Sequence, residues 1–361
     1  MAIHIKDFSI GSFKGIKDLS LKDLNHINII TGNNNTGKTS ILELLYTIND
    51  PNRIGCWFFS NHLDSRSNKE RFFDYYNNLF PADENDSSIY YEYYDYLDRA
   101  HKVNVDREIK TELVSEDTLP DTNKSSRDDY TPSDYSDGER FIENKTLYFK
   151  ISRDLNAPTI HEINSIQPGL DFFVPKKVDL AVNYISPVDH SKAFELDDIL
   201  RDNELHEEMI AILREFDDSI IDVVSVGNGS LSYMIRSKKH SKVLPLNFYG
   251  DGMRKALLML SSMLGSKNGI LLLDEFETAI HTSAMDHIFS WLLNSAIKLN
   301  VQVFLTSHSK EAINKVLRCD ESISDKISYY TLFSYEGKNL VRRLSCSEAI
   351  KLQDQGGMDI R

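Results

Sequence analysis

The segment Gly32–Ser40, with the sequence Gly-Asn-Asn-Asn-Thr-Gly-Lys-Thr-Ser, constrains this chain more than any other feature. Before it, His26–Ile30 has the composition of a short buried strand, and after it Ile41–Ile48 has helical spacing without glycine or proline. In that context the glycines let N–H groups turn toward phosphate oxygens, Lys38 reaches the terminal phosphates and the Thr39 hydroxyl binds Mg²⁺. A glycine turn without a ligand would not need this context. We therefore expect the cofactors ATP and Mg²⁺, and a phosphate-binding loop of Gly32, Asn33, Asn34, Asn35, Thr36, Gly37, Lys38, Thr39 and Ser40.

A pair of acids marks a second candidate site element. Four apolar residues, Ile270–Leu273, precede Asp274 and Glu275, as in a buried strand that ends in two carboxylates. Beside a phosphate-binding loop, the first acid is expected to hold the Mg²⁺ shell together with Thr39, and the second to orient or deprotonate the attacking water. Taken alone, the pair could equally be a solvated strand end.

A histidine follows a third apolar strand. Val301–Thr306 is strand-like and leads into Ser307-His308-Ser309. A histidine at the carboxyl end of such a strand is either structural or contacts the γ-phosphate. The order of loop, acid pair and histidine along the chain favours contact with the phosphate, so we assign His308 a catalytic role with Glu275.

Two glycines stand before a further helix. Gly250-Asp251-Gly252 directly precedes the helical stretch Arg254–Leu264. Free N–H groups at a helix N-terminus bind anions, so we place Gly250, Asp251 and Gly252 among the nucleotide-binding residues. The alternative is a glycine turn that Asp251 caps.

The rest of the chain predicts an α/β fold. Strand-like text covers residues 3–10, 19–24, 146–151 and 178–185, and the stretch 194–216 looks helical. A hairpin is expected from Ile220 to Ile235 across Gly227-Asn-Gly229. In the last third, buried strands that end in polar residues alternate with helices, the layout of a parallel sheet with ligands at its carboxyl edge. No heptad pattern persists, so no long coiled coil is expected.

The stretch 50–140 is rich in Asn, Asp, Ser and Tyr, and most of the chain's acidic excess lies within it. Residues 81–140 carry 17 Asp and Glu against 7 Lys and Arg, a net of −10 of the −14 for the whole chain. The tyrosines at 90, 91, 93, 94 and 96 could stack bases, but we expect a helix with aromatic packing. We expect a mobile acidic segment over 81–140, of which the polar stretch 117–140 is the most loop-like part. This segment is either a surface that faces a partner or a solubilising segment.

Composition limits the class of protein. No apolar run is long enough to span a membrane, and residues 1–7 show no apolar core of a secretory signal. The three cysteines, Cys56, Cys319 and Cys346, form no metal or redox spacing. We therefore expect a cytoplasmic protein. The net charge of −14 makes direct DNA binding the less favoured expectation, although a local basic groove stays open.

These motifs together resemble the ABC-type ATPase heads of the RecF, SMC and OLD group, whose loops favour an asparagine at the position of Asn34. The text around Gly250, Asp274-Glu-Phe-Glu277, His281, Thr306–Ser309 and Gly357–Arg361 resembles the stand-alone ATPases of bacterial anti-phage operons, such as the ATPase subunit of the PARIS system. The resemblance covers about residues 1–48 and 180–361.

The resemblance implies a homodimer or higher homo-oligomer in which two heads pair head to tail and the glycine signature of one chain closes over the ATP of the other. Three departures stand out. Gly250 replaces the serine of many relatives, no loop glutamine is assignable, and Phe13-Lys14 is a weak match to the first-strand motif that would bring Lys14 near the phosphates.

Together these observations predict an ABC-type α/β head formed by residues 1–49 and 226–361, with a helical or irregular lobe inserted at 50–225. The expected function is slow ATP hydrolysis by the sensor or scaffold subunit of an anti-phage defence system, which holds or releases an effector protein, a nuclease or toxin, from a neighbouring gene. The alternative is a RecF-like repair ATPase that clamps DNA directly. An OLD-type nuclease is not expected, because only about fifty residues follow His308.

Overall fold

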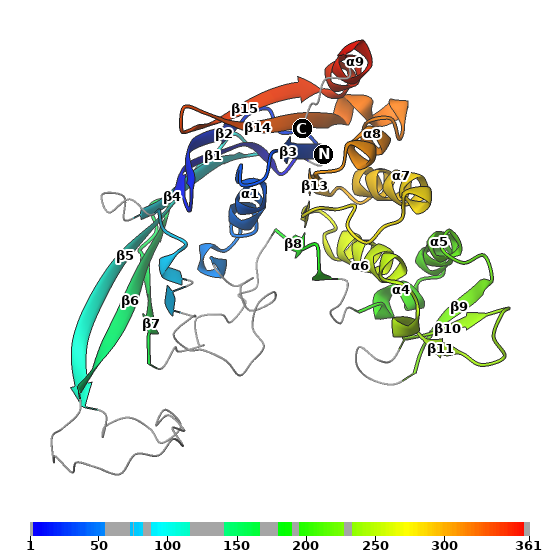
Figure 1. The fold of residues 1–361 in the computed structure, drawn as a ribbon, viewed down its shortest axis with the longest axis horizontal. Coiled ribbons are helices and arrows are strands. Elements are labelled where there is room, and N and C mark those ends of the chain that lie inside the picture. The colour runs from blue at the N-terminus through cyan, green and yellow to red at the C-terminus, as the bar shows by residue number, and fades with distance from the viewer. Residues whose placement is uncertain are drawn as a thin grey trace, which may run out of the picture.

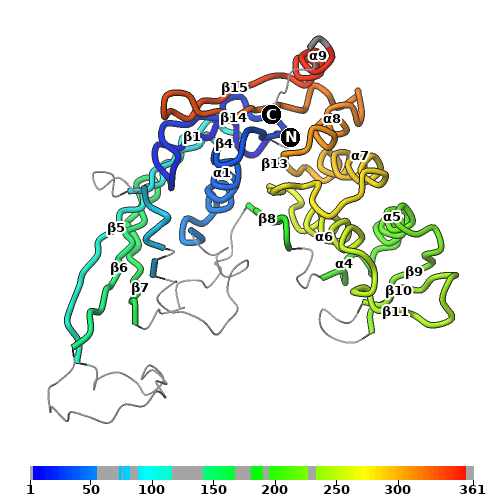
Figure 2. Tube along the Cα trace, viewed as in Figure 1, coloured from blue at the N-terminus to red at the C-terminus, as the bar shows by residue number. Residues whose placement is uncertain are grey.

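A central six-stranded sheet organises the molecule, which we describe from a computed structural model over residues 3–54, 73–74, 76–81, 88–115, 141–166, 180–189, 195–226 and 233–356. The strand order is β15-β14-β3-β13-β12-β8, in which every neighbouring pair is parallel except the edge pair β14–β15. The strands are β3 (Ile27–Gly32), β8 (Val182–Ile185), β12 (Ile270–Leu273), β13 (Gln302–Thr306), β14 (Ile327–Tyr335) and β15 (Lys338–Ser345). Strands far apart in sequence thus lie side by side, as the blue and orange segments of Figure 2 show.

The inner strands consist mostly of apolar residues because both of their faces are covered. Every residue of β3, β12 and β13 is buried, as expected for parallel strands between two layers. Alternate residues face opposite sides: Leu271 and Leu273 belong to one hydrophobic cluster, Ile270 and Leu272 to the other. This layout confirms the predicted α/β head with a mixed, largely parallel sheet.

Helices cover one side of this sheet. They are α6 (Asp251–Gly265), α7 (Thr282–Lys298) and α8 (Lys310–Leu317), with α9 (Cys346–Gly356) beside β14 and β15 (Figure 1). The longest helix in the described ranges has 17 residues. Those ranges therefore contain no long coiled coil, and none of their helices is long and apolar enough to cross a membrane.

The other side carries α1 (Lys38–Leu45) and a second six-stranded sheet, which is antiparallel and has the order β2-β1-β4-β5-β6-β7. Its strands are β1 (Ile5–Phe13), β2 (Ile16–Leu21), β4 (Ser88–Asp95), β5 (Ala100–Ser115), β6 (Phe141–Arg153) and β7 (Thr159–Asn164). In Figure 1, β5 and β6 extend from the body as a long arm.

The tyrosine cluster lies in this sheet, so the predicted helix is wrong. In β4 the side chains of Ile89, Tyr91 and Tyr93 are buried, while Tyr90 and Tyr94 are partly exposed on the opposite face. This alternation is that of a strand with one face on a core. Tyrosines on both faces conceal the two-residue period, because tyrosine serves equally in a core and at a surface.

A small third sheet accompanies two helices beside α6. The strands β9 (Ile220–Ser225), β10 (Tyr233–Ser237) and β11 (Leu244–Pro245) are antiparallel. The predicted helix over 194–216 is two helices, α4 (Asp197–Arg201) and α5 (Asn203–Arg214), which meet where the Asp202 side chain caps α5. Short 3₁₀ turns at Pro51–Arg53, Leu246–Phe248 and Glu321–Lys326 complete the elements.

The segment 50–225, which we assigned to an inserted lobe, contributes strands to both six-stranded sheets. Strand β8 lies within 50–225 and yet pairs with β12, and β4–β7 pair with each other and with β1. The division of the chain into domains stays a prediction. The predicted loop 117–140, Cys56, the turn Gly227–Gly229 and the ending Gly357–Arg361 lie outside the described residues, as do residues 82–87 and 116 of the predicted acidic segment.

Candidate functional site

The loop between β3 and α1 has a conformation that requires its two glycines. Gly32 has φ 146° and Gly37 has φ 94°, both in the region that favours glycine. A Cβ atom on Gly32 would lie 2.4 Å from the Leu332 carbonyl oxygen, and one on Gly37 would lie 2.7 Å from Ile16 Cδ1. The backbone of the loop is thus packed between β14 and β2, and a side chain at either glycine would displace it.

Lys38 begins α1 and lies across this loop. Its ammonium group donates to the carbonyl oxygens of Gly32 and Asn33, each at 2.8 Å, and its side chain is largely buried. Burial lowers the pKa of Lys38, whereas the nearby carboxylates of Asp274 and Glu275 raise it. The loop therefore encloses a positive charge that faces the two acids.

Asp274 lies at the centre of a group of hydroxyls. Its Oδ2 atom accepts from Thr39 Oγ1 at 2.9 Å and from the Tyr184 hydroxyl at 3.1 Å, and its Oδ1 atom accepts from Thr306 Oγ1 at 2.5 Å. Burial and the Asp274 charge raise the pKa of Tyr184, so its hydroxyl stays a donor. Thr39 and Asp274, which are 235 residues apart, meet as the sequence motifs predict.

Sequence reasoning missed Tyr184 and Thr306. Each lies at or near the carboxyl end of a strand that pairs with β12, the strand directly before Asp274. Tyr184 pairs with Leu272, and Leu305, which precedes Thr306, pairs with Leu273. Thr306 is the last residue of a predicted strand that leads to His308, so its place at the carboxyl edge of the sheet could have been inferred from sequence. Tyr184 could not be found without knowing that β8 is a neighbour of β12.

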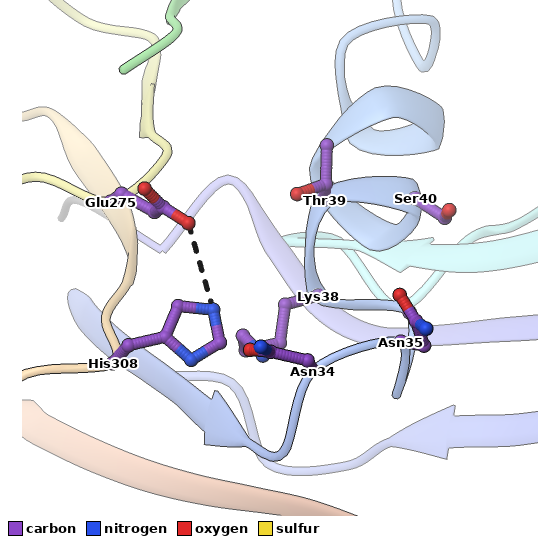
Figure 3. A pocket seen from close by; sticks show the side chains of 8 residues that line it. Asn34, Asn35, Lys38, Thr39, Ser40, Glu275 and His308 are labelled. Atoms are coloured by element: carbon purple, nitrogen blue, oxygen red, sulfur yellow. Dashed lines mark ion pairs between the residues drawn. The ribbon is translucent and has the colours of Figure 1, made fainter.

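Glu275 and His308 lie next to each other on the side of the pocket opposite α1 (Figure 3). His308 Nε2 lies 3.6 Å from Glu275 Oε1, and both side chains are partly exposed. Glu275 has φ 42°, an uncommon backbone conformation for a non-glycine residue. Its amide donates to Thr306 Oγ1 at 2.9 Å, which holds the turn. Glu275 thus lies beyond the end of β12, and its carboxylate points toward His308 in the pocket (Figure 3).

These groups line one cavity of about 390 Å³. Figure 3 shows Lys38, Thr39 and Ser40 from α1 on one side and Glu275 and His308 on the other. Most of the site residues expected from sequence are thus brought together. The lining within the described residues is Asn34, Asn35, Gly37, Lys38, Thr39, Ser40, Glu275 and His308.

The glycine signature lies elsewhere on the same chain. Gly250 is the N-cap of α6 and Asp251 is its first residue, and neither belongs to the pocket lining. A Cβ atom on Gly252 would lie 2.7 Å from the Ala279 carbonyl oxygen, so this glycine permits close packing on the loop after Glu275. A Cβ atom on Gly250 would meet nothing within 4 Å. One chain alone therefore does not bring the signature to its own phosphate loop.

Lys14 contacts α1, the helix that follows the phosphate loop. It follows β1, has φ 51°, and its ammonium group donates to Glu43 Oε2 of α1 at 2.5 Å. Glu43 is buried, and burial raises its pKa to about 7 although Lys14 lowers it. The lysine of the Phe13-Lys14 motif thus joins the antiparallel sheet to the helix of the phosphate loop, and it is not among the residues that line the cavity.

The oxygen donors around Asp274 fit Mg²⁺. The Thr39 hydroxyl and the Asp274 carboxylate are hard oxygen ligands, 2.9 Å apart, and Mg²⁺ in nucleotide sites takes one or two such protein ligands together with phosphates and water. Within the described ranges, no group of three or more His, Cys, Asp or Glu side chains could hold a metal by itself. Such a sparse donor set agrees with an ion shared with a nucleotide.

Comparisons with known proteins agree with this geometry. Residues 27–314 match the AAA_21 family, described as "AAA domain, putative AbiEii toxin, Type IV TA system". The chain is 24% identical over 345 residues to an ATP/GTP phosphatase of Helicobacter pylori (strain ATCC 700392 / 26695), covering 86% of each protein. It is 34% identical over 117 residues to an uncharacterized protein of Methanocaldococcus jannaschii, covering 31% of this chain and 98% of that one.

A solved structure supports the fold. The SMC head bound to the C-winged helix domain of ScpA superposes with a TM-score of 0.51 at 11% identity, over 96% of this chain and 99% of that chain. This likeness confirms an SMC-head-like ATPase fold.

Proposed function

Because this chain belongs to the AAA_21 family, we propose that it is a Mg²⁺-dependent ATPase that cleaves ATP to ADP and phosphate. One observation carries the proposal: Lys38, Thr39, Glu275 and His308 line one cavity, and buried Asp274 accepts a hydrogen bond from Thr39. A coincidental glycine loop would not have a carboxylate and a histidine from two other strand ends in its cavity, or a buried aspartate bonded to its threonine.

The chain's own groups divide the chemistry. Loop N–H groups and Lys38 hold the phosphates by charge-assisted hydrogen bonds. Thr39 and Asp274 would hold Mg²⁺, which supplies positive charge at the phosphate oxygens when bound. Glu275 orients a water molecule and accepts its proton. His308, 3.6 Å from Glu275, is placed to contact the γ-phosphate.

We further propose that hydrolysis requires two chains. The signature Gly250–Gly252 is not part of the pocket lining of its own chain, whereas Asp251 is exposed and the space beside Gly250 is open. A head-to-tail dimer brings these N–H groups to the phosphates bound by the partner. Gly250 offers no side-chain hydroxyl, so that contact rests on backbone N–H groups.

The proposed biological role is that of a sensor or scaffold subunit in a bacterial anti-phage defence system, whose ATP cycle holds or releases a nuclease or toxin. The toxin-system description of the family supports this role. The runner-up is a RecF-like ATPase that clamps DNA; the net charge of −14 disfavours it. Nanomolar affinity for duplex DNA at physiological salt, with a steep salt dependence, would favour the runner-up.

Phosphate release from ATP, measured on the purified protein, tests the proposal. We expect hydrolysis that requires Mg²⁺ and disappears with EDTA, and an ATP-dependent increase in mass by light scattering. GTP is the comparison substrate, since a relative is named an ATP/GTP phosphatase. Absence of hydrolysis with either nucleotide, at protein concentrations high enough for dimerisation, would contradict the proposal.

A further inference from the structure

Glu277 lies two residues after Glu275, outside the pocket lining, and its carboxylate holds the segment that carries His308. Its Oε1 atom accepts three hydrogen bonds: from Ser307 Oγ at 2.7 Å, and from the amides of His308 and Ser309 at 3.2 Å each. A single carboxylate oxygen thus binds every residue of the turn between β13 and α8.

The turn has further local supports. Ser307 is fully buried, and its Oγ atom accepts from the Ser309 amide at 3.0 Å. The Ser309 side chain caps α8 by accepting from the Ala312 amide at 3.2 Å. Because the His308 amide donates to Glu277, this carboxylate fixes the position of the His308 backbone, from which the imidazole extends.

We propose that Glu277 is a positioning residue for ATP hydrolysis, which acts by holding His308 in place opposite Glu275. The inference rests on the proposed function. Glu277 joins two segments of the site: Glu275 and Glu277 belong to the segment after β12, and His308 belongs to the turn after β13. The carboxylate of Glu277 sets the spacing between the two segments and, with it, the 3.6 Å separation of Glu275 and His308.

The chemistry at Glu277 suits a carboxylate. Hydrogen bonds to an ionised acceptor are about twice as strong as neutral ones, and one oxygen here serves three donors. The Oε2 atom is buried and has no hydrogen-bond partner among the described residues. Leaving a buried oxygen unpaired costs free energy. The three hydrogen bonds that Oε1 accepts from the turn offset this cost.

A purely structural role makes a different prediction. If Glu277 only stabilised the fold, its loss would lower the melting temperature and would reduce activity by the same factor whether or not His308 is present. If Glu277 acts through His308, its loss has little effect once His308 is gone. A double-mutant cycle separates these cases.

The experiment combines Glu277→Ala, Glu277→Gln and His308→Ala in the full chain. We expect Glu277→Ala to lower kcat about 10-fold or more, with KM for ATP within about 2-fold, and to lower it less than about 2-fold further in the His308→Ala background. Glu277→Gln keeps one oxygen acceptor and should retain kcat within about 3-fold. The matched control is Glu208→Ala, which removes a partly buried carboxylate that accepts from Trp291 Nε1 at 3.2 Å on the α5–α7 contact.

Amide exchange gives a readout that needs no catalysis. In Glu277→Ala the amides of His308 and Ser309 should exchange about 10-fold faster or more, while those of α5 do not change. Equal kcat losses in both backgrounds, or unchanged exchange at His308 and Ser309, would overturn the role of Glu277. A wild-type protein that hydrolyses no nucleotide would instead overturn the proposed function, and the positioning role with it, whatever the exchange shows.

Discussion

The two sides of the α1 helix differ in how directly sequence reveals structure. Toward the carboxyl edge of the parallel sheet, β3, β12 and β13 are mostly apolar and buried along their whole length, and the residues that follow them carry the chemistry. In the antiparallel sheet, β4 alternates between a buried and a partly exposed face and most of β5 is exposed or partly exposed, and no residue of the candidate site comes from either strand. The carboxyl edge of the parallel sheet thus carries the candidate site, and the antiparallel sheet contributes hydrophobic core and exposed surface.

We expect substitutions in the site to change ATP binding, and substitutions in the antiparallel sheet to change stability. Hydrophobic residues of the two regions meet in one cluster, which includes Leu42 of α1, Tyr91 and Phe149. One polar link between the two regions is the Lys14–Glu43 ion pair. Substitutions in either region therefore separate binding from stability, and the link tests how far the two regions are coupled.

The largest effect is expected for Lys38→Ala. Loss of the ammonium group from the phosphate loop should weaken ATP binding by about 1000-fold or more, about 4 kcal/mol. Calorimetric titration of ATP measures the change. The matched control is Lys110→Ala in β5, where the ammonium group lies 4.8 Å from the Tyr148 ring and affinity should not change. Equal ATP affinity in Lys38→Ala and wild type would refute the phosphate-loop assignment.

The next effect is on stability and belongs to the antiparallel sheet. Phe149 is fully buried and its ring centroid lies 5.5 Å from that of Tyr76 and 5.6 Å from that of Phe80. Phe149→Ala should reduce the free energy of unfolding by about 3–5 kcal/mol, measured by urea denaturation. The folded variant should bind ATP with wild-type affinity. A 100-fold loss of affinity would show that the two regions are not independent.

A smaller, pH-dependent effect is expected at the link. Burial raises the pKa of Glu43 to about 7 from its ordinary value of 4.5, so between these values the folded state binds the proton more readily than the unfolded state. The stabilisation is therefore fully present below about pH 4.5 and is lost as the pH rises through 7.

Glu43→Gln tests this sign. Relative to the Gln variant, the wild type should lose stability between pH 5 and 7 by up to about 1.4 kcal/mol per pH unit, measured by denaturation at each pH. Glu92→Gln, on the outer face of β4, is the control and should show a much smaller difference. A wild type that gains stability over this range relative to Glu43→Gln would contradict the account.

The smallest effect on ATP hydrolysis is expected for the acidic segment. Replacement of residues 117–140 by a short Gly/Ser linker should leave the ATPase rate within about 2-fold, because the motifs at 32–39 and 249–308 lie outside it. If the segment faces a partner, biological output is lost nevertheless. Loss of both would mean that the segment supports the fold, and loss of neither that it is a solubilising loop.

What sequence could predict follows from the physics of each region. The loop, Asp274, Glu275 and His308 were found because buried strands that end in polar residues are locally visible. Tyr184, Thr306 and Glu277 were missed or given no role because their contacts depend on strand order and on turn geometry. The β4 strand was taken for a helix because its tyrosines occupy both faces.

The most direct test of the central claim is ATP turnover by Glu275→Gln. The amide fills the same space but cannot accept the proton of the attacking water, so kcat should fall about 100-fold or more, while ATP affinity stays within about 3-fold and ATP traps a closed dimer detectable by light scattering. Glu92→Gln in the antiparallel sheet should turn over at the wild-type rate. Wild-type turnover by Glu275→Gln would show that another residue activates the water and would contradict the account.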